Sequence, residues 1–541
     1  MTVTAPPPRA IDDPKVSSLL WAAGRDDVTP DLGAVDPDEL FTALHAHRLD
    51  GRFWTRIRDS EHGRRHPGLA RRAEERIRDI RTQVRRRAEL TRRLAAALRE
   101  DGGTQPLIPL KGFTLMALTG DPDAVRYSGD LDVVPDDPAA LARVARGLGF
   151  AVQGPTEVLD EYARMVAPDH GMIEIHSYFP VPHWSPLPAG AVDPAAHPGA
   201  WAHEVALPHH HVRFTDLAPH LVPSAPVTAP DGTALLPPGI AVLRPEAAVL
   251  IQAAHLFGDY VRTVFPLPAG TIRLDELASV RRMCALPGFD PAVLRALIDV
   301  TRSADIVGFL RAASLDLLGH DPFAAALGTF QRPAVLPVDL WWDGVEGFLT
   351  DLGWHPGELV VRREGPLDVL RRLGTAALTV PVGGPAVTVA VPGDGGARAP
   401  RVIHRSRPGQ PLTGHVELSA GRHALSIELS VSAAEPGWMT AVSCNFGDHR
   451  WEVFFHGPDQ PVQFDDYSIA DLPAGGAGRD ATASAHREEG RDVIRVEIPW
   501  HRLDDPHHRS GPLALLLGLR RQEMPWGATA AGVILPLELR F

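Results

Sequence analysis

Apolar residues recur at helical spacing in the first hundred residues of the chain. In the segment 67–100, the clearest case, Ile77, Ile80, Val84 and Leu94 fall on one face of a helix. The segment 36–59 has a similar helical character, and its opening Asp-Pro suits an N-cap followed by the first helical position. A shorter helix is expected around 17–23, within a stretch rich in Pro, Asp and Ala. The pattern predicts helices that follow a loose lead-in over residues 1–35.

From residue 105 onward, short apolar runs alternate with helical segments. Strands are expected at 105–110, 131–135 and 172–179, and helices at 112–120 and 138–150. This β-α-β-α-β order predicts an α/β domain, which together with the preceding helices covers residues 36–240. Its last part, 180–240, is expected to form loops with short strands. Helical spacing returns over 245–320 and predicts a helical subdomain with its connection over 241–375.

The last third of the chain has short alternating or apolar runs that are separated by Gly, Pro and Asp turns. The runs are AVTVAVP, HALSIELSVSA, WEVFFH, VIRVEIPW, LALLLGLRR and VILPLELRF. This spacing is typical of an all-β sandwich, which we place at residues 385–541 after a Gly/Pro-rich boundary. The predicted fold class is therefore multidomain: an α/β core with a helical subdomain, followed by a C-terminal β-sandwich.

Composition limits the classes of function. Lys and Arg number 54 against 67 Asp and Glu, which gives a net charge of −13 and argues against a nucleic-acid binder. No apolar stretch approaches the length of a membrane span, and the N-terminus has no signal-peptide pattern. The two cysteines, Cys284 and Cys444, exclude a disulfide framework and fit a reducing cytoplasm. Lysine occurs only at Lys15 and Lys111, so Lys111 stands out in an arginine-rich chain.

The residues that indicate chemistry are acidic and lie in predicted strands. Asp130 and Asp132 are two positions apart in an apolar strand, so their side chains point to the same side. Two carboxylates that close repel each other unless a cation lies between them, which suggests Mg²⁺ or Mn²⁺. Glu174, in the later strand, offers a third carboxylate. The layout is the one that two-metal nucleotidyl transfer requires.

The order of these motifs resembles the nucleotidyltransferase fold of the DNA polymerase β superfamily. It is most similar to a bacterial family of uncharacterised nucleotidyltransferases. The matching motifs are Leu110-Lys111-Gly112, Arg126-Tyr127-Ser128-Gly129-Asp130-Leu131-Asp132, Glu174-Ile175-His176, Ala254-His255-Leu256 and Arg273-Leu274-Asp275-Glu276-Leu277. The resemblance covers about residues 40–330 and implies a polymerase β-like core.

The resemblance also implies roles for particular residues. Asp130, Asp132 and Glu174 would be metal ligands and catalytic residues, with Glu174 also acting as the general base. Lys111, Gly112, Arg126, Ser128 and Gly129 would bind the nucleotide, with Arg126 on a phosphate oxygen. The implied cofactor is Mg²⁺ or Mn²⁺, and the implied partners are an NTP and an unidentified acceptor. Two departures leave the substrate open: the superfamily has Gly-Ser where this chain has Lys-Gly, and more often Asp where it has Glu174.

Several residues allow two interpretations. His176 is either a core histidine near the site or a phosphate contact, and His255 and Asp275 either anchor the helical subdomain or serve only its core. The arginines of the 67–100 helix form either an anion-binding face or a solvated one. His209, His210 and His211 are consecutive on a predicted strand, and alternation makes them a poor single chelate.

The C-terminal region, with its Glu-Ile-Pro-Trp strand at 497–500, resembles carbohydrate-binding family 9 domains. The resemblance implies a possible carbohydrate partner, on which Trp438, Trp451, Trp500 or Trp526 would stack unless they are buried. The predicted function is metal-dependent transfer of a nucleotidyl group from an NTP to a hydroxyl or phosphate. The alternatives are a non-catalytic glycan- or partner-binding protein and a transferase that uses a nucleotide-sugar donor.

Overall fold

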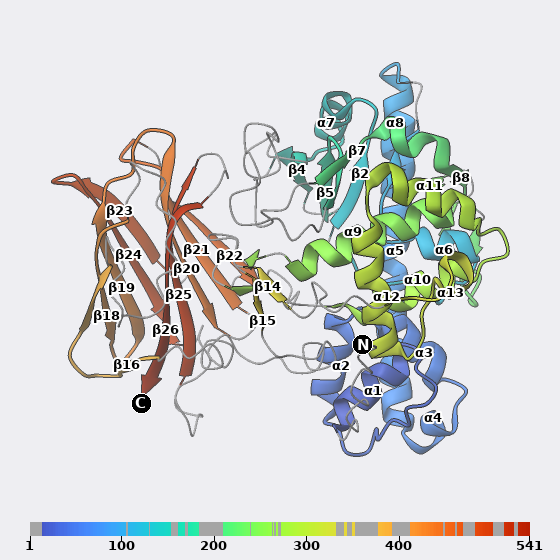
Figure 1. Ribbon diagram of the computed structural model, residues 1–541, viewed down its shortest axis with the longest axis horizontal. Coiled ribbons are helices and arrows are strands. Elements are labelled where there is room, and N and C mark those ends of the chain that lie inside the picture. Colours follow the sequence, from blue (N-terminus) through green and yellow to red (C-terminus); the bar gives the residue numbers. More distant parts are fainter. Residues whose placement is uncertain are drawn as a thin grey trace.

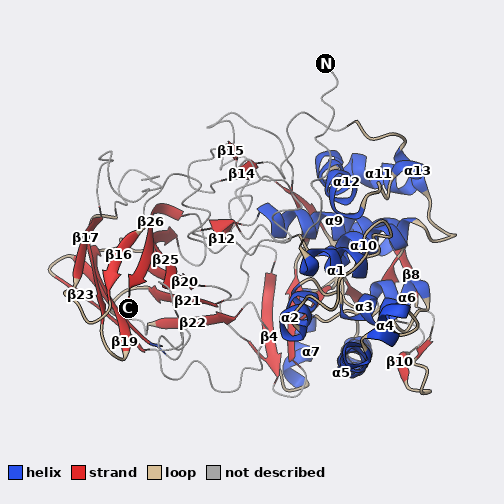
Figure 2. Ribbon diagram, turned by 90° about the horizontal axis from the view of Figure 1, so that it is seen from below, coloured by secondary structure: helices blue, strands red, loops and turns tan. Residues whose placement is uncertain are grey.

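The structure is a computed structural model of the chain, in which a helix-rich part lies beside a β-rich part (Figure 1). It describes residues 13–103, 106–128, 130–152, 161–167, 171–182, 209–224, 226–237, 240–261, 263–264, 267–268, 272–331, 340–342, 349–351, 377–391, 412–446, 449–459, 462–468, 482–500, 513–523 and 529–540. Figure 2 shows the same separation from a second direction, with the helices gathered in one half. None of the described helices combines the length and the apolar character that a membrane span requires.

Five helices open the chain: α1 (Pro14–Ala22), α2 (Pro37–Ala46), α3 (Asp50–Ile57), α4 (Glu61–Arg65) and α5 (Pro67–Glu100). The long helix predicted at 67–100 is confirmed by α5. The helical segment predicted at 36–59 is divided into α2 and α3, because Arg48 takes a left-handed backbone conformation with φ 56°. The side chain of Asp36 accepts hydrogen bonds from the N–H groups of Asp38 and Glu39, as expected of an N-cap.

A mixed five-stranded sheet forms the α/β core. Its strands are β1 (Ile108–Pro109), β2 (Asp130–Val134), β3 (Ala151–Val152), β4 (Glu161–Ala167) and β5 (Gly171–His176), in the order β1-β2-β5-β4-β3. Only β2 and β5 are parallel; the other neighbours are antiparallel. α6 (Thr114–Thr119) and α7 (Pro138–Gly147) belong to the connections. Alternation along β2 buries Leu131 and Val133 in one core with apolar residues of α5 and α7, so Asp130 and Asp132 lie on the other face.

The next part contains helices and short strands. The strands and short helical turns are β6 (Phe179–Pro182), β7 (His209–Val212), α8 (Phe214–Leu217), η1 (Ala218–His220), β8 (Leu221–Pro223), β9 (Val227–Thr228), β10 (Ala234–Leu236), β11 (Ala241–Leu243), β12 (Thr263–Val264), β13 (Leu267–Pro268), β14 (Leu340–Trp342) and β15 (Leu349–Asp351). The helices are α9 (Pro245–Val261), α10 (Leu274–Cys284), α11 (Pro291–Thr301), α12 (Ala304–Leu318) and α13 (Ala324–Leu327). Residues of α1–α3 share one hydrophobic core with residues of α9–α12, so the first helices pack with helices about 200 positions later.

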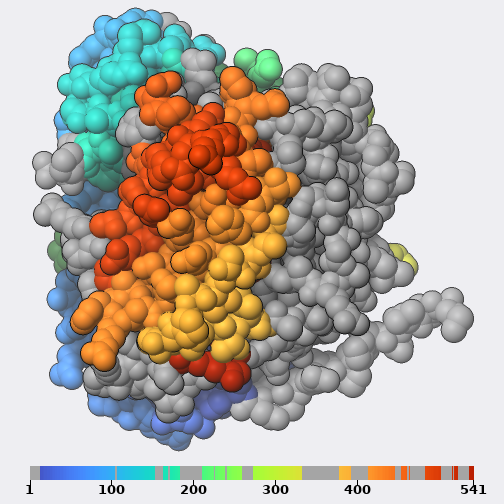
Figure 3. All heavy atoms as spheres, turned by 90° about the vertical axis from the view of Figure 1, so that its left-hand side faces the viewer, coloured from blue at the N-terminus to red at the C-terminus, as the bar shows by residue number. Residues whose placement is uncertain are grey.

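The β-rich part consists of two sheets. The strands are β16 (Leu378–Pro381), β17 (Val387–Val391), β18 (Gly414–Ala420), β19 (Ala424–Ser432), β20 (Trp438–Phe446), β21 (His449–Phe455), β22 (Gln463–Ser468), β23 (Thr482–Glu488), β24 (Arg491–Pro499), β25 (Leu513–Glu523) and β26 (Thr529–Arg540). One sheet has the order β16-β26-β25-β20-β21-β22 and the other β17-β18-β19-β24-β23. Apolar residues of both sheets form one buried cluster. Figure 3 looks onto this part, which runs in colour from yellow-orange to red.

The runs selected for their alternation all form strands, and the structure adds five strands that the pattern does not predict: β16, β18, β20, β22 and β23. In β20 the polar side chains of Thr440 and Ser443 are buried, which obscures the apolar pattern. Trp500 is also buried, and its indole N–H donates to the backbone oxygen of Gly421 at 2.8 Å, so this tryptophan packs in the core. The side chain of Trp438 is half-buried, and those of Trp451 and Trp526 lie outside the described residues.

A buried ionic network joins the two sheets at Asp492 of β24. Its carboxylate accepts hydrogen bonds from the hydroxyl of Thr440 at 2.7 Å and from Arg521 at 3.1 Å. Arg521 and Asp492 are both 0% exposed. A buried charge that loses its partner is costly, so this pair fixes how β24 and β25 lie relative to each other.

We predict that Asp492→Asn destabilises the protein strongly. The substitution leaves the buried Arg521 guanidinium uncompensated, which should lower the free energy of unfolding by about 3–5 kcal/mol. Urea denaturation of the full chain, followed by circular dichroism, measures the change. Glu428→Gln is the control, because Glu428 pairs with Arg495 at 2.8 Å on the exposed surface and should cost about 0–1 kcal/mol. Equal losses in the two variants would contradict the assignment.

Candidate metal and nucleotide site

The register of the parallel strands β2 and β5 brings two predicted carboxylates side by side. Asp132 of β2 is paired with Glu174 of β5, and Asp130 with Met172. Side chains of paired residues on neighbouring strands point to the same face of the sheet. The sheet therefore places Asp132 next to Glu174, although the two are far apart in the sequence.

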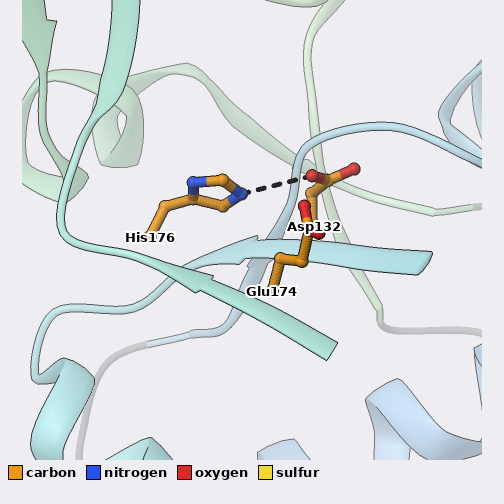
Figure 4. A group of neighbouring side chains, drawn as sticks. All are labelled: Asp132, Glu174 and His176. Carbon is orange, nitrogen blue, oxygen red and sulfur yellow. Dashed lines mark hydrogen bonds and ion pairs between the residues drawn. The ribbon is translucent and has the colours of Figure 1, made fainter. Parts of the chain in front are cut away.

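The imidazole of His176 joins these carboxylates. Potential ligand atoms of Asp132, Glu174 and His176 all lie within 4.8 Å of one another. Figure 4 shows the Glu174 side chain next to Asp132, with His176 reaching Asp132 from the end of β5. His176 Nε2 lies 3.2 Å from Asp132 Oδ1. Of the two interpretations of His176, its position beside the site is the one that the geometry supports.

Cationic side chains neutralise both carboxylates. Lys111 Nζ lies 3.2 Å from Asp132 Oδ2, and Arg164 Nη2 lies 3.1 Å from Glu174 Oε1. Burial alone would raise the pKa of Asp132, but the Lys111 ammonium and the hydrogen bond to His176 hold that pKa well below its usual range. Asp132 is therefore ionised at neutral pH even though only 4% of its surface is exposed.

Six of the predicted site residues line one pocket of about 370 Å³, part of which is open to solvent. They are Lys111, Gly112, Arg126, Ser128, Asp130 and Asp132. The Ser128 hydroxyl donates to Asp130 Oδ1 at 2.9 Å, and the Arg87 guanidinium donates to the backbone oxygen of Asp130. Asp130 thus lines the pocket with Asp132 but is not in the group of ligand atoms within 4.8 Å. Gly129 lies outside the described residues.

The turn of Lys111 and Gly112 connects β1 to α6. Gly112 has φ +82°, a left-handed conformation that side chains other than glycine rarely adopt. This turn sets the Lys111 side chain against β2, while the backbone of Leu110 donates to the oxygen of Asp132 at 3.1 Å. The glycine is therefore needed for the backbone path that delivers the lysine to Asp132.

Arg126 is held from the opposite direction by Glu276 of α10. Its guanidinium contacts Glu276 Oε1 at 3.5 Å and donates to Gln252 Oε1 at 3.4 Å. Glu276 is 0% exposed and also lies 3.7 Å from Arg48 and 3.5 Å from His255. Burial would raise the pKa of Glu276, but His255 and the surrounding arginines hold it well below its usual range.

The contacts around Glu276 support an anchoring role for His255 and Asp275 in the helical region. His255 contacts Glu276, and Asp275 accepts a hydrogen bond from Arg52 of α3 at 2.6 Å. In the sequence, Glu276 stands out only as part of one matching motif, and Arg48 belongs to none of the motifs. Burial lowers the pKa of Arg48 to about 10, so it remains charged at neutral pH. Its conformation between α2 and α3 gave no signal in the sequence pattern.

The arginines of α5 divide between the two interpretations offered for them. Arg81 pairs with Asp123, and Arg87 contacts β2, so these two face the core and the site. Others pair with acidic residues at the surface, as Arg78 does with Glu74 at 3.5 Å and Arg92 with Glu89 at 2.6 Å.

His211 stacks on Tyr178 with ring centroids 3.8 Å apart, whereas the His209 side chain lies outside the described residues.

The donor set of this site fits a divalent cation. Two carboxylate oxygens are hard ligands of the kind that Mg²⁺ and Mn²⁺ take, and an imidazole nitrogen completes the described group. The Asp132 carboxylate is ionised, as metal ligation requires, and it lines a pocket that is partly open to solvent. The residues that would hold the ion are Asp132 and Glu174, with His176 or Asp130 as the next ligand.

Comparison with known proteins supports the class that the fold and the site define. Residues 33–284 match the model of a family described as "Uncharacterised nucleotidyltransferase", which confirms the resemblance drawn from the motifs. This part of the chain is accordingly similar to a family of nucleotidyltransferases. No curated protein matches the chain.

Two solved structures with similarity to the chain are carbohydrate binding modules of family 9 from Caldicellulosiruptor kristjanssonii. The complex with cellotriose has 10% sequence identity and a TM-score of 0.20, covering 30% of this chain and 94% of that chain. The complex with glucose has 9% identity and a TM-score of 0.20, covering 30% and 96%. Likeness at this level carries no argument about the function of the β-rich part.

We predict that Glu276→Gln destabilises the protein most at neutral pH. Because the pKa of Glu276 is lower in the folded chain than its ordinary 4.5, its stabilising effect is complete above that value and is lost as the pH falls below it. Urea denaturation at several pH values should show a deficit of about 3–5 kcal/mol for the variant at pH 7. The deficit should shrink as the pH falls below 4.5. Glu74→Gln, which removes an exposed pair, is the control; a pH-independent deficit for Glu276→Gln would contradict the prediction.

Proposed function

We propose that this protein is a metal-dependent nucleotidyltransferase, which transfers a nucleotidyl group from an NTP to a hydroxyl or phosphate acceptor. The observation that carries the proposal is the pairing of Asp132 with Glu174 on adjacent strands, with Lys111 Nζ 3.2 Å from Asp132. Carboxylates that face a cation beside an open pocket are arranged for a polyphosphate and its metal. The family match over residues 33–284 supports the same class of reaction.

The side chains around the pocket have two roles: some would contact the phosphates, and others hold the carboxylates in position. Lys111 has a strongly hydrated ammonium that serves as a point charge for phosphate, whereas the planar Arg126 guanidinium suits two phosphate oxygens. Ser128 holds the Asp130 carboxylate by the hydrogen bond at 2.9 Å. His176 contacts one carboxylate oxygen of Asp132, and Lys111 contacts the other.

In the reaction, an acceptor oxygen forms a bond to the α-phosphorus of the NTP. The bond from that phosphorus to the bridging oxygen breaks, and pyrophosphate leaves. Glu174 takes the proton of a hydroxyl acceptor, while Arg164 at 3.1 Å stabilises its charged form until then. A divalent cation held by Asp132 and Glu174 would neutralise charge on the phosphates. Lys111 and Arg126 keep the pyrophosphate in place as its charge develops.

The proposed organisation of the chain keeps the divisions 1–35, 36–240, 241–375 and 385–541. We propose that the two sheets of the last division form a sandwich, since their apolar residues share one buried cluster. A carbohydrate or a carbohydrate-bearing acceptor is its proposed partner, but the buried Trp500 would take no part in sugar stacking. Contact with a sugar would fall to aromatic side chains nearer the surface, such as Trp438.

We predict that the double variant Asp130→Asn/Asp132→Asn abolishes metal-dependent binding and transfer of nucleotide. Purified protein would be incubated with Mg²⁺ or Mn²⁺ and each labelled NTP, following label transfer and intact mass. Asp136→Asn is the matched control, since Asp136 is exposed just beyond the end of β2. Wild type and control should behave alike. If neither binds any nucleotide with metal present, the proposed function is wrong.

We predict opposite effects of Lys111→Met on metal and on nucleotide. Removing the ammonium that competes for Asp132 should strengthen Mn²⁺ binding, and removing a phosphate contact should weaken ATP binding, each by about tenfold, the equivalent of 1.4 kcal/mol. Calorimetry with Mn²⁺ alone and then with ATP measures both. Lys15→Met, which changes the other lysine of the chain, is the control. A parallel loss of both ligands would instead indicate damage to the fold.

A further inference from the structure

A second pocket adjoins the candidate site at the Lys111-Gly112 turn. It has about 500 Å³ of space, part of which is open to solvent, and is bounded by residues of α3, α6, α9 and α10. Lys111, Gly112 and Arg126 line both pockets, so the two have a common wall. Among the described residues, Asp130 and Asp132 line only the first pocket.

The lining of the second pocket has an excess of positive charge. Its cationic side chains are Arg52, Lys111, Arg126 and Arg282, against the carboxylates Asp123 and Asp275. Both carboxylates are already engaged. Asp275 pairs with Arg52 at 2.6 Å, and Asp123 pairs with Arg58 and Arg81, which do not line the pocket. Each of the four cations is itself in an ion pair, but the partners Asp132, Glu276 and Asp121 do not line the pocket, so the lining still presents more cations than carboxylates to an entering anion.

Two buried polar groups of the lining have no hydrogen-bond partner in the structure: the Thr114 hydroxyl and the Gln252 amide nitrogen. Thr114 is 6% exposed and Gln252 is 7% exposed. Gln252 Oε1 accepts from Arg126, which fixes the amide with its N–H₂ group as the remaining donor. Buried donors without partners are rare in native proteins, and these two belong to the lining, where oxygen acceptors of a ligand would satisfy them.

We propose that the second pocket binds an anionic group of the acceptor, a phosphate or a carboxylate. The inference rests on the proposed function, because the shared wall would place the reactive oxygen of such an acceptor beside the nucleotide. In this proposal the nucleotide binds in the first pocket, which Asp130 and Asp132 line, because its phosphates need the metal. The guanidinium of Arg282, 33% exposed and paired with Asp121 at 2.8 Å, is the most exposed of the four cations that line the pocket and would contact the anion.

The test uses the full chain and two probe anions, inorganic phosphate and succinate, measured by calorimetry in the absence and presence of ATP with Mg²⁺. Arg282→Gln should weaken binding of the preferred anion by about tenfold. Thr114→Val, which changes no charge, should weaken it as well. Arg281→Gln is the matched control, because Arg281 is the neighbouring residue of α10 and donates to the backbone oxygen of Gly24 instead. Because Lys111 and Arg126 line both pockets, ATP should weaken anion binding only in part, and the anion should remain bound at saturating ATP.

Binding of phosphate alone assigns a phosphorylated acceptor, and binding of succinate alone assigns a carboxylate acceptor. The inference is overturned if neither anion binds, if Arg282→Gln and Thr114→Val bind as the control does, or if saturating ATP abolishes anion binding. The last result would assign the second pocket to the nucleotide. Anion binding that responds to the variants in a protein that binds no ATP would support the anion pocket and overturn the proposed function instead.

Discussion

Asp132 carries a negative charge in a place where water hardly reaches it. Moving an isolated carboxylate out of water is so costly that such a group normally takes up a proton. Asp132 avoids this because Lys111 and His176 each lie 3.2 Å from one of its oxygens. The arrangement of the strand β2, the Lys111-Gly112 turn and the end of β5 can be understood as the means of keeping this one carboxylate charged.

The same constraint relates the site to the helical region. Glu276 is a second fully buried carboxylate, and its partners come from separate parts of the chain: Arg48 between α2 and α3, Arg126 before β2, and the His255 imidazole on α9. Since Arg126 also lines the candidate site, the guanidinium that would contact phosphate is held by the helices. Packing of α10 against α3 is therefore part of building the site, which agrees with a single core for the first and the later helices.

Many of the helices and strands, and most residues of the candidate site, could be predicted from the sequence, because both depend on local patterns. Apolar periodicity gave α5, and alternation gave the strands that contain Asp130, Asp132 and Glu174. The motifs also led to six residues that line one pocket. Pairing between distant segments could not be predicted in the same way. The register that puts Glu174 opposite Asp132 is a property of the sheet, and the role of Glu276 depends on cations up to 228 positions away.

The break at Arg48 illustrates what a periodic pattern misses. Residues 36–59 read as one helical segment because their apolar positions keep helical spacing, yet the left-handed conformation of Arg48 ends one helix and starts another. An arginine gains nothing locally from that conformation. The gain is tertiary, because the break directs its guanidinium toward Glu276, 3.7 Å away. A conformation that is unfavourable for one residue is stabilised by a buried charge elsewhere, and only the folded chain shows that balance.

The two pockets also differ in what builds them. The first is lined by β2, by α5 and by the segments 111–113 and 126–128, and β2 and α5 contribute to one large apolar core that fixes their positions. The second is formed largely by side chains of α3, α6, α9 and α10, and ion pairs such as Arg52 with Asp275 join these helices to one another. Residues on helix surfaces can change without disturbing a sheet register. Under the proposed function, substitutions on these helices would change which acceptor binds while the carboxylates on the strands stay in place.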